Sequence, residues 1–302
     1  MISVIIPVYK NTKLFLDNLK KNIEFLKDCE ILIINDNPEQ SLKKEIEAFK
    51  KKNIFLIENK KNLGFGRSVN LGAKYAKGDY LFLLNTDVVL TNKNYLYAVK
   101  HFKKNPNLFA VSFAQLEKND QIIGKNVVYF KDGLFHHQKA NNLSFGENAW
   151  AEGGACLIDK KKFKSLRGFD ELYSPFYWED VDLSYRAWKA GFKIFFDPKI
   201  LVEHHHQSTI SKYFDENKIK TTAYRNQLIF TLKNSTDLDL IAKFIFFFFK
   251  RLIKSVTTFD LLYFKAATAF ISKIPLIIIK KIFDIKIYKI SDKTIISYFK
   301  NG

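Results

Sequence analysis

The chain is short of cysteine, of arginine and of long apolar runs. Its two cysteines, Cys29 and Cys156, lie far apart in 302 residues and form no CxxC pair, which excludes a disulfide-rich scaffold and suits a reducing compartment. No apolar run reaches the ~18 residues that mark a membrane-spanning helix. The apolar start at residues 2–8 is too short for a signal peptide and lacks its basic leader. We therefore expect a cytoplasmic protein, soluble or peripheral at the inner face of the cell membrane.

Arginine is scarce although the chain is strongly basic. Lys and Arg together number 49 against 31 Asp and Glu, a net charge of +18, and only 5 of these 49 residues are Arg. Such a charge suits a polyanionic partner, either a nucleic acid or an anionic membrane. A nucleic-acid-binding protein usually shows Arg clusters and a known docking motif. Because the sequence has neither, we expect no nucleic-acid partner.

The N-terminal part alternates between strand and helix patterns. Apolar runs at 2–6, 30–34 and 54–57 predict buried strands, and helical patterns lie between them at about 11–27 and 40–51. This alternation predicts an α/β fold with a doubly wound, mostly parallel sheet.

The two standard glycine-rich phosphate loops, GxGxxG and the P-loop, are missing. Asn62, Gly64, Gly66 and Arg67 instead precede or open the next predicted helix. Glycine at such a position lets the backbone approach a phosphate at the helix N-terminus.

A predicted buried strand ends in a carboxylate at residues 80–87. The apolar run 80–84 is typical of a central parallel strand, and Asn85-Thr86-Asp87 follows it directly. Open α/β sheets bind ligands at the carboxyl ends of their strands, and a divalent cation beside a phosphate prefers oxygen ligands. Asp87 is therefore either a metal ligand or a cap of the next element, and this stretch alone favours neither.

A second acidic group follows two aromatic residues. Glu179, Asp180 and Asp182 come directly after Tyr177 and Trp178. Capping of the helix that follows explains acidic residues in its first turn. It does not explain three carboxylates beside an aromatic wall. Such a wall would desolvate the carboxylates and adjust the pKa of one of them to that of a general base.

The scarce arginines give an independent indication of a site. Arg67, Arg186 and Arg225 all lie in segments that carry other motifs. A guanidinium suits a diphosphate or a carboxylate better than an ammonium does. Arg186 either contacts a ligand or only holds the acidic helix in place.

The pair His136 and His137 lies in a polar stretch, residues 131–146, that we expect to be a mobile loop. Adjacent residues rarely bind one metal ion, so a solvated pair is the better interpretation.

Three further histidines, His204, His205 and His206, follow short strands expected at 193–196 and 200–202. Successive side chains of a strand alternate between its faces, so one or two of the three can face a common site. Either at least one of them binds a metal, or they form a surface cluster.

The composition changes in the C-terminal part. Residues 216–302 contain 16 Lys and Arg against 6 Asp and Glu, a net charge of +10, with apolar helical patterns at 241–252 and 274–283. Phe-rich helices flanked by Lys are typical of an anionic membrane surface. Packing on the main domain, or a contact in a homodimer, is the alternative. We expect one domain at residues 1–215 and a basic helical region at 216–302, with membrane association favoured.

Taken in order along the chain, these motifs resemble the family 2 glycosyltransferases of the GT-A fold. The segments that carry the resemblance are 4–9, 35–36, 62–72, 78–87, 153–155, 168–171, 178–180 and 204–209. The likeness covers about residues 1–230 and is strongest to bacterial rhamnosyltransferases that build surface polysaccharides. It implies a Rossmann-like nucleotide-binding half and an acceptor half, followed by a C-terminal helical extension.

The resemblance also implies roles for single residues. It places a dTDP- or UDP-sugar donor against Pro7, Val8, Tyr9, Asp36, Asn62, Gly64, Arg67, Asn85, Thr86 and Gly154. It makes Asp87 a ligand of Mg²⁺ or Mn²⁺ together with one histidine, taken as His204, although the spacing permits another register. Asp180 would be the catalytic base, beside Glu179. Asn85 stands where many members carry Asp, which leaves the metal mainly to Asp87.

The implied reaction is an inverting, metal-dependent transfer of a sugar to a hydroxyl of a saccharide or a polyprenyl-diphosphate-linked saccharide. The predicted donor is dTDP-L-rhamnose, with a UDP-hexose or a galactofuranose donor as the alternative. A non-catalytic sugar-nucleotide-binding scaffold and a basic nucleic-acid-binding protein are the alternatives from other classes.

Overall fold

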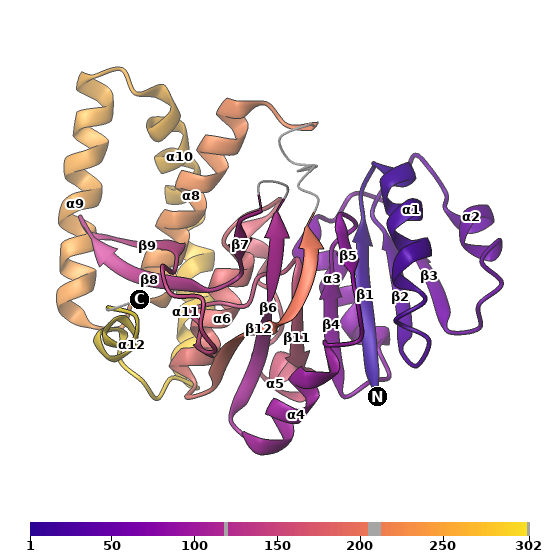
Figure 1. The fold of residues 1–302 in the computed structure, drawn as a ribbon. Coiled ribbons are helices and arrows are strands. Elements are labelled where there is room, and N and C mark those ends of the chain that lie inside the picture. The colour runs from indigo at the N-terminus through magenta and orange to yellow at the C-terminus, as the bar shows by residue number, and fades with distance from the viewer. Residues whose placement is uncertain (118–119, 205–212, 301–302) are drawn as a thin grey trace.

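The computed structural model describes residues 1–117, 120–204 and 213–300 (Figure 1). Its strands are β1 (Ile2–Val8), β2 (Glu30–Asn35), β3 (Ile54–Glu58), β4 (Tyr80–Leu84), β5 (Val88–Leu90), β6 (Leu108–Glu117), β7 (Ile122–Ile123), β8 (Asn126–Lys131), β9 (Leu134–Lys139), β10 (Gly146–Glu147), β11 (Ala155–Asp159) and β12 (Lys193–His204). Its helices are α1 (Thr12–Asn22), α2 (Lys43–Glu47), α3 (Phe65–Tyr75), α4 (Leu96–Lys104), α5 (Lys160–Ser165), the short 3₁₀ turn η1 (Glu171–Tyr173), α6 (Glu179–Lys189), α8 (Glu216–Asn234), α9 (Leu238–Thr257), α10 (Leu261–Ile271), α11 (Ile274–Ile285) and α12 (Asp292–Tyr298).

Most strands join one large sheet with the order β10-β12-β6-β11-β4-β1-β2-β3. The neighbours from β4 to β3 pair in parallel, as do β6 and β12. Strand β11 is antiparallel to both β4 and β6. The predicted doubly wound, mostly parallel α/β sheet with a C-terminal helical extension is confirmed.

The sheet has a hydrophobic core on each face. Val4 and Ile6 of β1 belong to the cluster that contains Phe15 of α1, whereas Ile5 belongs to the cluster that contains Val69 of α3. Successive side chains of a strand point to opposite faces, so one strand supplies both cores. Burial on both faces explains why the strands are continuous apolar runs in the sequence.

The stretch expected to be a mobile loop contains a β-hairpin instead. Strands β8 and β9 pair in antiparallel register, with Lys131 opposite Leu134. The two residues between them, Asp132 and Gly133, have φ angles of 49° and 74°. Asp-Gly with positive φ at both positions is typical of a type I′ hairpin turn. The prediction of a loop was wrong because this two-residue turn pairs the flanking residues as two strands.

The two short strands expected at 193–196 and 200–202 are one strand, β12. Its pairing with β6 shifts register between Asp197 and Leu201, around Pro198. Proline cannot donate to a ladder, and an irregularity lets the strand continue past it.

The C-terminal helices lie beside the β8–β9 hairpin, at the opposite end of the molecule from β3 (Figure 1). Phe230 of α8 contacts Phe135 of β9 and Tyr185 of α6, with ring centroids 5.5 and 5.3 Å apart. All three side chains belong to one core cluster, so α8 shares the hydrophobic core of the sheet domain.

Among the described residues, no single helix combines the length and apolar composition of a membrane span. Helices α10 and α11 meet that test only as a pair, with a 60° bend between them.

Candidate active site

A cavity of about 670 Å³ opens where β1 and β4 end, and α6 begins at its wall. It is lined by the sequence-predicted residues Pro7, Val8, Tyr9, Asp36, Asn62, Gly64, Asn85, Thr86, Asp87, Gly154, Glu179, Asp180 and His204. Parallel strands end at one edge of a sheet, which brings together residues that are distant in the sequence. Arg67, which was also predicted to contact the donor, does not line the cavity. Its guanidinium forms an ion pair with Glu171 at 2.7 Å.

Asp36 organises the part of the cavity wall that lies between the end of β2 and the loop before α3. Its carboxylate accepts hydrogen bonds from the backbone amides of Leu63 and Gly64 at 2.7 and 2.8 Å, and from Asn59 at 2.8 Å. Gly64 has φ 81°, and a Cβ there would lie 3.1 Å from the carbonyl oxygen of Pro175. Glycine is therefore required where the loop before α3 meets the opposite wall.

Asp87 and His204 face each other across the strand ends. The imidazole Nε2 lies 3.3 Å from Oδ1 of Asp87, and both residues are buried. Asp87 follows β4, and His204 ends β12, which pairs with β5. The other two histidines of the predicted cluster lie outside the described residues.

The donor set at this point is one carboxylate and one imidazole. Among the residues that the structure describes, no group of three His, Cys, Asp or Glu side chains could hold a metal ion. A divalent cation that is also bound by substrate phosphates needs only one or two protein ligands. Asp87 and His204 therefore fit a cation that enters with a diphosphate.

Glu179 and Asp180 are the first two residues of α6. Burial, and then the charge of Glu152, raises the pKa of Asp180 to about 6. Burial, and then the charge of Asp180, raises the pKa of Glu179 to about 8. Oε2 of Glu179 is buried and has no hydrogen-bond partner among the described residues. Near neutral pH the pair therefore combines an ionised Asp180 with a largely protonated Glu179.

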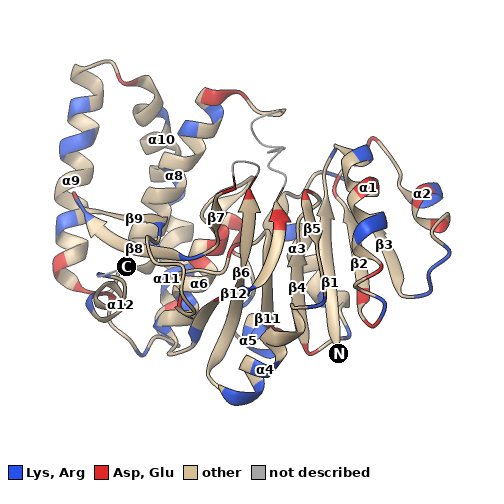
Figure 2. Ribbon diagram, in the orientation of Figure 1, with Lys and Arg blue, Asp and Glu red and all other residues tan. Residues whose placement is uncertain are grey.

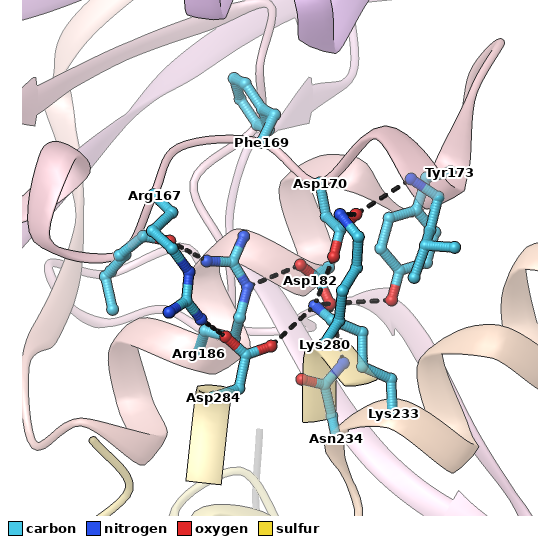
Figure 3. Close-up of polar contacts among 12 residues, drawn as sticks. Arg167, Phe169, Asp170, Tyr173, Asp182, Arg186, Lys233, Asn234, Lys280 and Asp284 are labelled. Carbon is cyan, nitrogen blue, oxygen red and sulfur yellow. Dashed lines mark hydrogen bonds and ion pairs between the residues drawn. The ribbon is translucent and has the colours of Figure 1, made fainter. Parts of the chain in front are cut away.

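Asp182 is turned away from the cavity, although the sequence grouped it with the acidic pair. Its carboxylate accepts hydrogen bonds from Tyr173, Arg186, Lys233 and Asn234 at 2.7–2.9 Å (Figure 3). Burial alone raises the pKa of Asp182, but the charges of Lys233 and Arg186 outweigh it and hold that pKa well below its usual value.

Arg186 holds the acidic helix in place. Its Nε donates to Asp182 at 2.7 Å, and its other nitrogens donate to the backbone carbonyls of Leu166 and Gly168. The side chain is buried, and of the two roles left open by the sequence it performs the structural one.

Several residues that line the cavity were not predicted to do so. Glu152 accepts hydrogen bonds from Gln115 at 2.5 Å and from Asn126 at 2.9 Å. The backbone amide of the next residue, Gly153, donates a hydrogen bond to Asp180. The ring of His137 lies 4.9 Å from Trp150 and 4.8 Å from Trp178, centroid to centroid. His137 lies on strand β9 and not in a loop, so that part of the prediction was wrong, whereas its exposed side chain agrees with the predicted contact with solvent.

Residues 3–167 match glycosyl transferase family 2. The chain belongs to this family. The matched residues contain the cavity-lining residues from Pro7 to Asp87. Asp180 and His204 lie after them.

Curated relatives that match this family 2 chain include poly-beta-1,6-N-acetyl-D-glucosamine synthases of staphylococci. The poly-beta-1,6-N-acetyl-D-glucosamine synthase of Staphylococcus epidermidis is 25% identical over 205 residues, which are 66% of this chain and 48% of that protein. The chain thus spans about half the length of the curated relatives that it matches.

Two solved structures share the fold. Residues 1–349 of S. aureus TarS, in complex with UDP-GlcNAc, superimpose with a TM-score of 0.55 at 17% identity, covering 100% of this chain and 92% of that one. The mannosyltransferase PcManGT from Pyrobaculum calidifontis, in complex with GDP-Man and Mn²⁺, gives a TM-score of 0.52 at 12% identity over 91% and 75% of the two chains.

Proposed function

We propose that this chain transfers a sugar from a nucleoside diphosphate donor to a hydroxyl of a saccharide acceptor, with inversion in a single displacement. One observation carries the proposal. The carboxylate pair of Glu179 and Asp180 lines the same cavity as the Asp87–His204 pair. The Glu179–Asp180 pair suits proton transfer, and the Asp87–His204 pair suits a cation bound to a diphosphate.

In this proposal Asp180 is the general base. Its pKa of about 6 leaves it ionised near neutral pH, yet close enough to neutrality to accept a proton efficiently. The acceptor oxygen attacks the anomeric carbon and gives its proton to Asp180, while the bond from that carbon to the diphosphate oxygen breaks. Glu179, with a pKa of about 8, can donate a hydrogen bond to the sugar or the acceptor.

Asp87 and His204 would hold Mg²⁺ or Mn²⁺ beside the donor diphosphate. When bound, such a cation neutralises the charge that develops on the departing nucleoside diphosphate. Asp36 and Gly64 keep the nucleotide side of the cavity in shape through their hydrogen bonds.

The proposal also concerns the identity of the donor sugar. The resemblance of the motifs favours L-rhamnose from dTDP-rhamnose. The relatives named for N-acetylglucosamine and bound to UDP-GlcNAc favour a UDP-sugar. We retain dTDP-rhamnose and UDP-N-acetylglucosamine as the two donors to compare first, with other UDP-hexoses and UDP-galactofuranose after them.

The test is release of nucleoside diphosphate from these donors, measured with Mn²⁺, with Mg²⁺ and with a chelator. Turnover of one donor that stops with the chelator and in Asp180→Asn is the expected result. Tight nucleotide binding without any turnover would instead favour a non-catalytic scaffold. Salt-sensitive binding of nucleic acid, with no nucleotide-sugar binding, would refute the proposal.

We also propose that the acceptor is lipid-linked and that the C-terminal helices contact an anionic membrane. Helix α9 buries Phe244 and Phe248 but exposes Phe246 and Phe249, which are 64% and 55% accessible. Basic side chains are spaced along the same helix (Figure 2). Exposed aromatic residues between lysines suit a lipid surface that carries negative charge.

Vesicle co-sedimentation of the full chain tests this surface. Binding to vesicles that contain phosphatidylglycerol, but not to pure phosphatidylcholine, should be lost in the double variant Phe246→Asp, Phe249→Asp. Unchanged binding would exclude α9 as the contact. A concentration-dependent dimer that the same variant disrupts would assign this face to a second copy of the chain.

A further inference from the structure

The loop before the acidic pair has an unusual backbone. Tyr177 and Trp178, two successive residues with bulky side chains, have φ angles of 70° and 76°. L-residues other than glycine rarely adopt this left-handed region, and they remain there only where surrounding contacts hold them. The next residues are Glu179 and Asp180, so this backbone sets where the two carboxylates enter the cavity.

The contacts that hold the loop come from Asn226 of α8. Its side-chain nitrogen donates hydrogen bonds to the backbone carbonyls of Tyr173, Phe176 and Tyr177 at 2.8, 2.9 and 2.8 Å. Phe176 directly precedes the two left-handed residues, and Tyr177 is the first of them. Asn226 is fully buried, so the loss of these bonds would not be compensated by water.

Arg225 fixes the orientation of this amide. Its guanidinium donates to Oδ1 of Asn226 from Nε at 3.0 Å and from Nη2 at 2.8 Å. The same Nη2 donates to the carbonyl of Ser174 at 2.6 Å. With its oxygen facing Arg225, the amide must present its nitrogen to the three loop carbonyls.

Helix α8 also reaches the first turn of α6 through Lys233. The ammonium nitrogen lies 2.8 Å from Asp182, 3.1 Å from Asp170 and 3.2 Å from Asp284, and it is inaccessible to solvent (Figure 3). Asp182 is two residues after Asp180. The acidic pair is therefore flanked by two attachments to one helix, with Asn226 before it and Lys233 after it.

We infer that Asn226 is a positioning residue that holds the 173–178 loop so that Glu179 and Asp180 face the acceptor. The inference rests on the proposed function for the role of the two carboxylates. It gives α8 a part in catalysis, although this helix lies after the residues that match the family and in the region that the sequence assigned to a membrane or oligomer contact.

Asn226→Asp is the sharpest test. Aspartate has the same size and keeps an oxygen toward Arg225, but it replaces the donor that faces three carbonyls with an acceptor. We expect kcat to fall about 10²-fold, the effect of a small misplacement of catalytic groups. The affinity for the nucleoside diphosphate with Mn²⁺, measured by calorimetry, should stay unchanged, because Pro7, Asp36 and Asp87 lie in or shortly after strands β1, β2 and β4 and not in the 173–178 loop.

Asn53→Asp is the matched control. The Asn53 amide also donates to two backbone carbonyls, those of Leu26 and Cys29, but beside the start of β3, at the end of the sheet away from the cavity. A similar change of thermal midpoint with unchanged kcat is expected. An equal loss of kcat in this variant would show that the effect is general destabilisation, and it would overturn the inference.

Hydrogen–deuterium exchange separates this inference from the proposed function. Amides of residues 174–182 should exchange faster in Asn226→Asp, whereas those of α3 should not change. Wild-type exchange in this segment overturns the inference whether or not a donor is found, while the absence of turnover by wild-type protein with every donor counts against the proposed function alone. If Asn226→Asp does not fold, Arg225→Lys, which loses the bonds to Asn226 and Ser174, must show the same local change.

Discussion

Asp180→Asn should make the protein more stable at pH 8. In the folded chain the pKa of Asp180 is raised from 3.8 to about 6, mainly by burial. Between these two pH values the folded protein binds more protons than the unfolded chain, so its stability falls as the pH rises through this window and stays lower above it. One pKa unit corresponds to about 1.4 kcal/mol, so the ionised carboxylate destabilises the fold by about 3 kcal/mol.

The substitution also removes a hydrogen-bond acceptor. The backbone amides of Gly153 and Val181 donate to different oxygens of Asp180, at 3.4 and 2.9 Å. An amide side chain has one oxygen, so one of these bonds is lost, at a cost of about 1 kcal/mol. The expected net gain is therefore about 2 kcal/mol at pH 8. It should vanish at pH 4, where the folded wild-type carboxyl is already protonated.

Urea unfolding of both proteins at pH 4 and pH 8 measures this difference, with Asp28→Asn as a control because the Asp28 side chain is 84% exposed. Donor turnover at pH 8 should fall by ~10²–10⁴ in Asp180→Asn if the carboxylate is the base. Equal stability at pH 8, or an equal gain at both pH values, would refute the raised pKa. Full turnover would refute the catalytic assignment.

Three further changes test other parts of the site. Glu152→Gln removes a charge that raises the pKa of Asp180, so the acid limb of the pH–rate profile should move to lower pH; a shift to higher pH would contradict this. Asp87→Ala should abolish the metal-dependent part of nucleotide binding in calorimetry, and unaltered affinity would remove Asp87 from the metal site. Lys233→Met leaves three buried carboxylates without their shared cation and should cost about 3–5 kcal/mol in unfolding experiments. Lys243→Met, at an exposed and distant ion pair, is the control for Lys233→Met and should change stability by less than about 0.5 kcal/mol.

The sheet was predictable because its strands have a strong local signal. Strands buried on both faces are continuous apolar runs, and Leu81 to Leu84 is one of them. The signal for the β8–β9 hairpin is equally local, since Asp132-Gly133 is a recognised turn signal between two strands, so the loop predicted there had no physical basis. The continuity of β12 past Pro198 depends on its pairing with β6, which no local pattern contains.

The site was predictable where its residues follow strands. Asp36 and Asp87 reach the cavity because parallel strands end at one edge, a rule that needs no coordinates. Glu152 and Gln115 could not be found in this way, since their bond joins residues 37 positions apart. The ion pair of Arg67 with Glu171 is equally non-local, and it engages the guanidinium that the sequence assigned to the donor.

The net charge of residues 216–302 does not show how many of their basic side chains are available to a membrane. Lys233 contributes to the excess of +10, yet it is buried, and its ammonium nitrogen lies 2.8 Å from Asp182. Lys243 of α9, in contrast, is exposed. A lysine that neutralises a distant buried carboxylate and one that faces a lipid surface are identical in a count. Truncation before α8 would therefore remove the cation beside Asp182 together with any membrane contact, so only substitutions of exposed side chains on α9 can separate the two roles.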